Sequence, residues 1–410
     1  MIKVNKYFPF AFIYFFINAV GLPFGLTYMT LLAPFFYVWV TITRKKEVLL
    51  PFILVMTPFV AVHILYVGVE MDSYLLSVIN LLLVYVFCQA FYTFLLVCKD
   101  KERVFRGILF INFILCLIAI PFFFSSNYAL FWDQQILTEG VGRMRRLRLF
   151  TYEPSYYAFL FTPIALYFLL QYFLRQNYIS GIWLLPMILL PYILSLSIGV
   201  TGAISLSLFF TWIFYFNRLT SRRRILNTLI SAGFAMTSSL FVAVMYFRSN
   251  PLFIRMRNIF TGRDTSGRGR TYEAFMLAEK MLQQGSEWWG IGLGQIKILG
   301  DGIIRDFYLY NMDIVVTLPN AAAETLAMFG WAGLLLRIAF ELFLFFYTKV
   351  WTNYYRLVLF LFVFIYQFTG SFITNIAEYV IWILAFCPVF PQFNVQQAAG
   401  SERSVRPVLS

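Results

Sequence analysis

Charged residues are scarce in this chain of 410 residues. Only 12% of them are Asp, Glu, Lys or Arg, about half of the roughly 25% that is typical of soluble domains. Because 61% of the residues are hydrophobic and 20% are aromatic, the composition excludes an ordinary soluble protein. The mean hydropathy of +0.76 is instead typical of a polytopic membrane protein.

Cysteine and histidine are also rare, with four copies and one copy. The cysteines, which lie in or at the edge of apolar runs and form no CxxC pair, indicate neither a disulfide framework nor a zinc site. We interpret them as small buried apolar side chains. We interpret His63, which lies within a predicted span, as a packed or hydrogen-bonded polar residue. The four cysteines are Cys88, Cys98, Cys116 and Cys387.

Several catalytic motifs are absent. The sequence has no DxD metal clamp, HExxH, P-loop or GxSxG elbow, so nucleotide-sugar transfer on the inner face and metalloprotease, ATPase and lipase chemistry are unsupported. The glycine-rich segment from Gly290 to Gly294 follows no predicted strand, so we interpret it as a tight turn and not as a nucleotide site. We expect neither a metal nor another cofactor.

Long apolar runs are what the sequence does contain. A hydrocarbon core about 30 Å thick needs roughly 20 apolar residues per helix, and on that basis we predict an all-α polytopic fold with about 12 transmembrane helices. The first run, from Tyr7 to Thr41, is divided by Gly21 and Pro23, and no cleavage site follows Lys3 and Lys6, so the first span should be retained. The other predicted spans are Leu49 to Val69, Tyr74 to Val97, Val104 to Phe124, Ser155 to Leu174, Ile182 to Ser197, Gly199 to Phe216, Ile225 to Phe247, Asn320 to Tyr347, Leu357 to Phe372 and Ile376 to Phe390. The pair on either side of Ser197 is also consistent with one broken helix.

The spans predict six segments along the chain. Two of them are loops rich in arginine, and the last is a short, polar and flexible tail. We expect helices 1–5 in residues 1–124, a loop in 125–154, helices 6–9 in 155–247, a large loop with an amphipathic helix in 248–318, helices 10–12 in 319–390 and the tail in 391–410.

The basic residues are distributed unevenly. If the N-terminus is cytoplasmic, alternation places 18 of the 32 Lys and Arg residues on the inside and one, Arg337, within a span. The other 13 fall in the two loops that alternation places outside, against the positive-inside bias, and 11 of these are Arg. Both termini are then cytoplasmic.

Arginine in those two outer loops predicts an anion site. A guanidinium group binds phosphate through two parallel hydrogen bonds, whereas an ammonium group acts as a point charge. The alternative is that these residues neutralise lipid head groups or pair with local acids. As phosphate ligands we select Arg145, Arg146 and Arg148 in the first loop and Arg263, Arg268 and Arg270 in the second. Replacing Arg148, Arg268 or Arg270 with alanine should then abolish function without unfolding the protein.

Glu153 stands immediately before Pro154 and the apolar run that follows. Proline favours the first turn of a helix, so Glu153 should lie at the N-terminal edge, close to the arginine cluster. A carboxylate there is a candidate general base for an acceptor hydroxyl. An equally good interpretation is a helix cap tied to Arg148.

The second outer loop contains a predicted amphipathic helix from Thr271 to Gln284. Phe275, Leu277, Met281 and Leu282 form its apolar side, and we expect it to lie along the membrane surface. The arginines of this loop would stand at its N-terminal end, where backbone N–H groups favour anions.

Four charged residues lie within predicted spans, where a charge costs at least ~3 kcal/mol and tends to mark function. Arg337 and Glu341 are one turn apart and should pair with each other. Glu324, which is one turn from Asn320, and Glu378 lie near the outer ends of their spans. They therefore join Glu153 as candidate bases, and Asn320 joins them as a candidate catalytic residue.

The order of these features resembles the Wzy-type polysaccharide polymerases of bacterial inner membranes, the colanic-acid kind being nearest. The segment from Arg148 to Ala158 resembles the arginine-then-Glu-Pro element at the start of a span. The segment from Ser197 to Gly202 resembles the small-residue segment that follows this element in the family. Four further segments resemble the family's outer loop and the helix after it: Gly267 to Arg270, Gly290 to Gly292, Pro319-Asn320 and Gly330 to Gly333. The segment Thr369-Gly370-Ser371 before Glu378 is also similar. Related O-antigen ligases have a histidine before the asparagine, whereas this chain has Pro319, so a histidine base is excluded there.

The resemblance implies a GT-C-like glycosyltransferase that acts on the periplasmic face of a bacterial inner membrane without a metal. It implies a glycan on undecaprenyl pyrophosphate as donor, a second lipid-linked repeat unit as acceptor, contact with membrane lipids and a chain-length-regulating membrane protein as a partner. It implies no nucleic acid. The alternatives are an O-antigen ligase of the same architecture and a transporter or flippase of lipid-linked oligosaccharide. A transporter should show half-to-half symmetry and charged residues on broken helices, and the sequence shows neither clearly.

Overall fold

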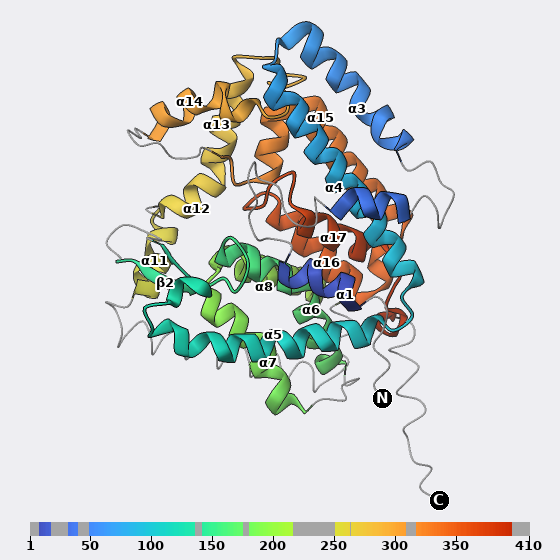
Figure 1. Ribbon diagram of the computed structural model, residues 1–410, viewed down its shortest axis with the longest axis vertical. Coiled ribbons are helices and arrows are strands. Elements are labelled where there is room, and N and C mark those ends of the chain that lie inside the picture. The colour runs from blue at the N-terminus through green and yellow to red at the C-terminus, as the bar shows by residue number, and fades with distance from the viewer. Residues whose placement is uncertain are drawn as a thin grey trace, which may run out of the picture.

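The protein is described from a computed structural model that is almost entirely helical (Figure 1). It describes residues 8–17, 32–39, 49–135, 142–174, 180–215, 251–262, 264–308 and 317–395. The predicted span from Ile225 to Phe247 and the C-terminal tail beyond residue 395 lie outside these ranges. The larger helices are α3 (Leu50–Val62), α4 (Met71–Val97), α5 (Lys101–Phe123), α6 (Pro154–Phe173), α7 (Gly181–Ser195), α8 (Ile198–Phe214), α15 (Ala321–Tyr347), α16 (Tyr354–Tyr366) and α17 (Ile376–Phe386).

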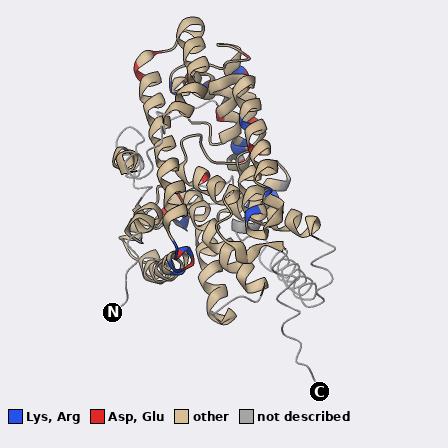
Figure 2. Cartoon of the chain, turned by 90° about the vertical axis from the view of Figure 1, so that its right-hand side faces the viewer, with Lys and Arg blue, Asp and Glu red and all other residues tan. Residues whose placement is uncertain are grey.

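Five helices among the described residues are long and apolar enough to cross a membrane. They are α3 with the π-helical turn His63–Val67 that continues it, α4, α5, α6 and α15. On α3 only 17% of the apolar window is buried, and Leu54 and Tyr66 are 65% and 90% exposed. A helix with such a surface is stable in lipid and not in water. Figure 2 shows that most of the helical surface carries no charged residue. The chain is therefore a helical membrane protein.

The count of 12 spans is not established by the described residues. Besides the five long helices, four apolar helices of 10–17 residues are present there: α7, α8, α16 and α17. The first predicted run contributes α1 (Phe8–Phe12), a π-helical turn (Ile13–Ile17) and a helix at residues 32–39. Helix α16 ends earlier than predicted because residues 367–375 leave the helix and carry polar side chains into the protein interior, where irregular backbone is tolerated. Helix α17 begins at Ile376 as predicted but ends at Phe386, before the predicted Phe390.

Helix α6 forms the centre of the bundle. In its apolar window 83% of the residues are buried, against 33% in α4 and in α5. It packs on α7, α8, α16 and α17, and its aromatic side chains fill the main hydrophobic core, as when Phe159 stacks on Tyr366 at 4.6 Å between ring centroids. The start of this helix, at Glu153, is therefore held firmly relative to its neighbours.

Helices α5 and α6 run in opposite directions. Near the start of α5, Phe105 packs on Tyr167 from the second half of α6 and on Phe390, with ring centroids 5.3 Å apart in both pairs. At the same end of the bundle, Arg356 at the start of α16 donates to the carbonyls of Ala385 and Phe386, where α17 ends. This end holds the basic residues that alternation assigns to the inside between α4 and α5.

The opposite end of the bundle holds both arginine-rich segments. Helix α5 crosses the molecule from the end of α4 to a hairpin of two short strands, β1 (Trp132–Gln135) and β2 (Met144–Leu147) (Figure 1). The hairpin is attached there because the indole of Trp132 donates to the carbonyl of Ala119 at 2.7 Å. The all-α prediction did not include this sheet. The predicted loop of residues 125–154 thus contains a two-stranded antiparallel sheet, and its strand β2 carries Arg145 and Arg146.

The second arginine-rich segment is also largely helical. It consists of α11 (Pro251–Phe260), α12 (Thr265–Arg270), α13 (Tyr272–Leu282) and α14 (Leu299–Tyr308). The predicted amphipathic helix is α13, and Leu277, Met281 and Leu282 of its apolar side are buried inside the protein, whereas the sequence predicts a helix that lies along the membrane surface. They pack against α15 in a second hydrophobic cluster. The helix breaks from α12 at Thr271, so Arg268 and Arg270 lie in the last turn of α12 and precede α13.

Helix α15 is broken at Gly330, where the sequence predicts a continuous span. Gly330 has φ 66° and ψ −167°. The segment around Gly290 runs alongside the break, so Ile291 and Gly292 donate to the carbonyls of Ala327 and Met328 at 2.9 and 3.0 Å. On the far side, the N–H groups of residues 331 and 332 donate to the carbonyls of residues 287 and 288. The glycines therefore permit close backbone contact as well as a turn.

We expect Gly330→Ala to destabilise the protein by about 3 kcal/mol or more. A Cβ there would lie 2.3 Å from the carbonyl carbon of Trp288, and the positive φ disfavours any side chain. The midpoint of thermal unfolding in detergent measures the effect. Gly302→Ala in α14 is the matched control, because a Cβ at that position meets no atom within 4 Å. Equal midpoints for the two variants would contradict the close contact.

Candidate functional site

A cavity of about 270 Å³ lies where the two arginine-rich segments meet. Residues of the hairpin, the starts of α6 and α8, α11, α12 and the end of α16 line it. Arg146, Arg255 and Arg270 all line it, the first from β2 and the other two from the second segment. Residues more than 100 positions apart in the sequence thus form one site.

Arg146 is held rigidly in the cavity wall. The residue is 4% exposed, and its Nε donates to the carbonyl of Ser195 at 2.9 Å, at the C-terminal end of α7, where the helix dipole favours a cation. Its Nη1 donates to Gln135 at 3.0 Å. Burial, and then the nearby charge of Arg255, lowers the pKa of Arg146 to about 10, which leaves it protonated at neutral pH. A bound anion would offset both effects.

Arg255 extends from α11 into the same cavity. Its Nε lies 3.1 Å from a carboxylate oxygen of Asp264, and its side chain is 10% exposed. The Nη1 atom is buried and has no hydrogen-bond partner among the described residues. A buried donor without a partner costs about 1–3 kcal/mol, and a ligand oxygen in the cavity would remove that cost.

Arg270 connects the cavity to Glu153. Its Nη2 lies 3.6 Å from a carboxylate oxygen of Glu153, and both side chains are about one quarter exposed. Burial would lower the pKa of Arg270, but the charge and hydrogen bond of Glu153, together with the nearby side chains of Tyr366 and Tyr152, raise it. The carbonyl of Arg270 accepts a hydrogen bond of 2.9 Å from the side chain of Asn320. Asn320 also caps α15 through Ala323, so it is a positioning residue for Arg270.

Glu153 occupies the N-cap position of α6, as the sequence predicts, but its side chain makes no capping hydrogen bond. Its ion-pair partner is Arg270 and not Arg148. Although Glu153 is not part of the cavity lining, it contacts a residue that is. Among the predicted bases, it is the one that the structure brings to the arginines.

Small residues form another part of the wall. Helix α7 ends at Ser195, Leu196 adopts the left-handed conformation with φ 49°, and α8 begins at Ile198. This break is the one that the sequence predicts near Ser197. A Cβ on Gly199 or Gly202 would meet no atom within 4 Å, so both glycines leave space in the cavity.

The other predicted arginines have different positions. Arg145 lies outside this cavity, with its guanidinium 3.9 Å from the ring centroid of Tyr128. Arg148 donates to the carbonyls of Thr151 and Ala129, so it braces the turn before α6. Arg268 pairs with Glu273, whose hydrogen bond raises the pKa of Arg268. Arg263 lies outside the described residues.

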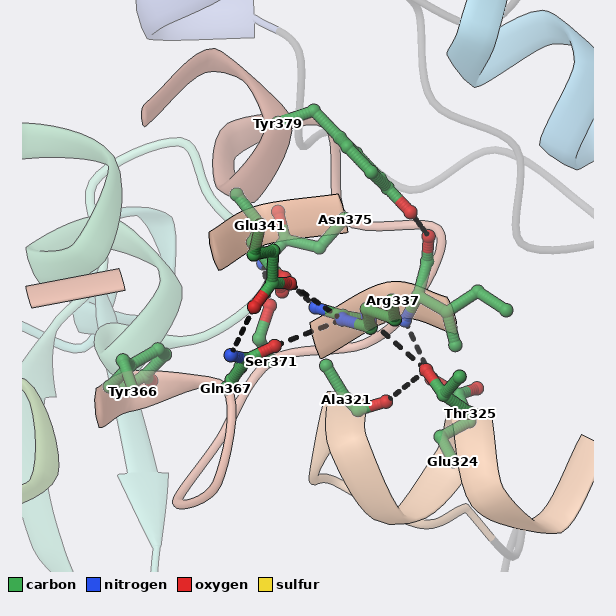
Figure 3. A network of polar contacts seen from close by, with 12 residues as sticks. Ala321, Glu324, Thr325, Arg337, Glu341, Tyr366, Gln367, Ser371, Asn375 and Tyr379 are labelled. Carbon is green, nitrogen blue, oxygen red and sulfur yellow. Dashed lines mark hydrogen bonds and ion pairs between the residues drawn. The ribbon is translucent and has the colours of Figure 1, made fainter. Parts of the chain in front are cut away.

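Two predicted bases lie in or beside a separate polar network inside the bundle (Figure 3). Arg337 contacts Glu341 at 3.1 Å, which confirms the predicted pair, and Thr325 at 3.0 Å. It also forms an ion pair with Glu378, which is 1% exposed and whose buried Oε2 has no hydrogen-bond partner in the described part of the chain. Glu324 accepts a hydrogen bond of 2.6 Å from the N–H of Ile373. Neither Glu324 nor Glu378 lines the arginine cavity.

His63 and the cysteines have the structural positions that the sequence predicts. His63 is fully buried, with Nδ1 3.0 Å from the hydroxyl of Tyr74 and Nε2 2.7 Å from the carbonyl of Trp289. All four cysteines are free thiols, three of them buried. The described residues contain no group of three His, Cys, Asp or Glu side chains placed to hold a metal ion.

Neither a family model nor a curated protein matches the chain. The fold and the hydropathy define its class, a helical membrane protein.

Sequence reasoning did not select Arg255. Nothing in the sequence separates it from Arg257, two positions later, which is exposed. The one available signal is Asp264, nine residues further on, because a carboxylate in a basic segment marks an arginine that is held in place. The spacing of nine residues could not predict the contact between Arg255 and Asp264, since α11 ends and the chain turns between them.

Proposed function

We propose that the protein is a glycosyltransferase that polymerises lipid-linked repeat units on the outer, periplasmic face of a bacterial inner membrane. One observation carries the proposal: three arginines from two separate segments line one cavity next to a carboxylate. The lining holds three guanidinium groups and the single carboxylate of Asp264, so its net charge suits a pyrophosphate.

The proposed reaction transfers a glycan from undecaprenyl pyrophosphate to a sugar hydroxyl of a second lipid-linked unit. The hydroxyl oxygen forms a bond to the anomeric carbon of the donor as the bond from that carbon to the pyrophosphate oxygen breaks. Glu153 takes the hydroxyl proton, and the leaving undecaprenyl pyrophosphate takes the electron pair. Negative charge develops on the pyrophosphate, and the three fixed arginines stabilise it in the transition state.

A transporter of lipid-linked oligosaccharide is favoured by one observation, the broken helix α15, because transporters bind substrates at interrupted helices. In this protein, however, the segment of residues 287–292 already pairs with the four backbone groups next to the break. These four groups are therefore not available to a substrate. An O-antigen ligase of the same architecture would differ only in its acceptor, which the cavity does not specify.

The test incubates the purified protein with one lipid-linked repeat unit, without nucleotide, and separates the products by length. A ladder of chains supports a polymerase, whereas unchanged repeat units support a transporter. Gly202→Val should shorten the ladder, because the added methyl groups enter the cavity and leave every arginine in place. Arg305→Gln in α14 is a matched control for charge, since Arg305 pairs with Asp301 outside the cavity.

We expect Glu153→Gln to lower kcat about 10²–10⁴-fold with little change in KM, because the amide keeps the shape of the side chain and cannot take a proton. Steady-state rates of chain extension measure this. Glu279→Gln on the exposed side of α13 is the control for loss of one carboxylate. If Glu153→Gln extends chains at the normal rate, Glu153 is not the base.

A further inference from the structure

A second cavity, of about 580 Å³, lies elsewhere along the hairpin. We call it the lateral groove. The ends of α5 and α7 form its walls. Its lining includes Phe123, Phe124, Gln134, Arg143, Arg145 and Ile193. It shares none of these residues with the arginine cavity.

The alternation of side chains along β2 separates the two sites. Successive residues of a strand point to opposite faces, so Arg145 enters the lateral groove whereas Arg146 enters the arginine cavity. The cross-strand partner of Arg145 is Gln134, which also lines the groove. The hairpin thus presents one guanidinium to each site.

Arg145 is held in place within the groove. Its guanidinium lies 3.9 Å from the ring centroid of Tyr128 and 5.6 Å from that of Phe123, and it donates to the carbonyl of Phe123. Arg143 is exposed at the same site. Among the described residues, the groove lining contains these two arginines and no carboxylate, so an anion fits there.

The rest of the groove continues into the surface that faces lipid. Phe124 is 82% exposed and Ile193 is 61% exposed, and both line the groove. Beyond them, the outward side of α7 carries exposed apolar residues such as Leu189 and Trp183, at 48% and 63%. An apolar chain leaving the groove would therefore remain in contact with apolar side chains.

We propose that the lateral groove binds a polyprenyl phosphate, with its phosphate on Arg143 and Arg145 and its chain along α5 and α7. Two arginines match a phosphomonoester or diphosphate, which carries more than one charge, better than the single charge of a phosphodiester. The inference rests on the proposed function for the choice of a polyprenyl chain. It adds a lipid-binding subsite outside the arginine cavity.

The test measures binding of farnesyl phosphate to the purified full-length protein by native mass spectrometry. Arg145→Gln should weaken binding about tenfold or more, because one charged contact is lost. Arg143→Gln, at an exposed position, tests the same groove if Arg145→Gln does not fold. Arg106→Gln, which removes an arginine at the other end of α5, should bind normally.

Three other ligands test the chemistry. Farnesol and inorganic phosphate should each bind much more weakly than farnesyl phosphate, because each lacks half of the contacts, and phosphatidylglycerol should compete poorly. Normal binding by both the Arg145 and Arg143 variants would overturn the proposal. So would equal binding of farnesol, of free phosphate or of phosphatidylglycerol.

The outcomes separate this inference from the proposed function. If farnesyl phosphate binding requires Arg145 but no glycan ladder forms, the lipid-binding groove is supported and the polymerase function is contradicted. If a ladder forms and neither the Arg145 nor the Arg143 variant changes binding, the polymerase function is supported and the lipid-binding groove is not.

Discussion

Arg146→Gln is expected to reduce the rate of chain extension by about 10³-fold or more. The guanidinium lies in the wall of the cavity at 4% exposure, already oriented by the carbonyl of Ser195, so it can stabilise a developing charge without reorganising. Removing one such donor from a catalytic site typically costs about 10²–10³-fold, and a full charge lost beside a diphosphate costs more.

Arg146→Lys provides the informative comparison. It keeps the charge but loses the fork that contacts Ser195 and Gln135 together. We expect a rate between those of Arg146→Gln and the unmodified protein. Both variants should remain folded at a cost of about 1–3 kcal/mol, which thermal unfolding measures. A normal ladder from Arg146→Gln, with Arg305→Gln as control, would remove the arginine cavity from the reaction.

The largest expected effect on stability comes from Arg337→Leu. Arg337 is the only cation that contacts Glu341 and Glu378 among the described residues, and it lies in the interior of the bundle (Figure 3). Without it, two carboxylates would remain in a medium of low polarity. Breaking a buried ion pair from one side typically costs about 3–5 kcal/mol. We expect little folded protein in the membrane, measured as the yield of monodisperse material in detergent.

A triple variant tests whether the loss is electrostatic. Arg337→Leu combined with Glu341→Gln and Glu378→Leu removes the charges together, and well-packed apolar replacements of buried ion pairs are often neutral. We expect the triple variant to recover most of the yield. If Arg337→Leu alone is as stable as the unmodified protein, the network does not hold α15, α16 and α17 together. Glu378→Gln would then be the variant to test for catalysis.

This interpretation changes the role of two predicted residues. The sequence places Glu378 and Glu324 near the outer ends of their spans and so makes both of them candidate bases. The structure places Glu378 on Arg337 and Glu324 on the backbone of Ile373. Each contact joins a helical residue to a segment that is more than 40 positions away in the sequence, and the pattern of one helix cannot indicate such a contact.

For the arginines, too, the sequence predicts the general feature and the tertiary structure decides which residues take part. The excess of arginine in two outer segments is a property of the sequence, and it predicts that an anion site lies among them. Which arginines meet depends on how β2 alternates, where α7 breaks and how α11 turns back to Asp264. Arg145 and Arg146 are neighbours in the chain, yet they line different cavities.

By itself, the sequence determined the class of the protein, the positions of its long helices, the break near Ser197 and the pairing of Arg337 with Glu341. These depend on hydropathy and on spacings within one helix, which are local. Tertiary structure alone decided that α15 breaks at Gly330, that Arg255 lines the arginine cavity, that Asn320 positions Arg270 and that the hairpin lines two separate cavities. Each of these depends on which helix ends meet, because a backbone carbonyl or a guanidinium has a definite partner only after distant segments have packed together.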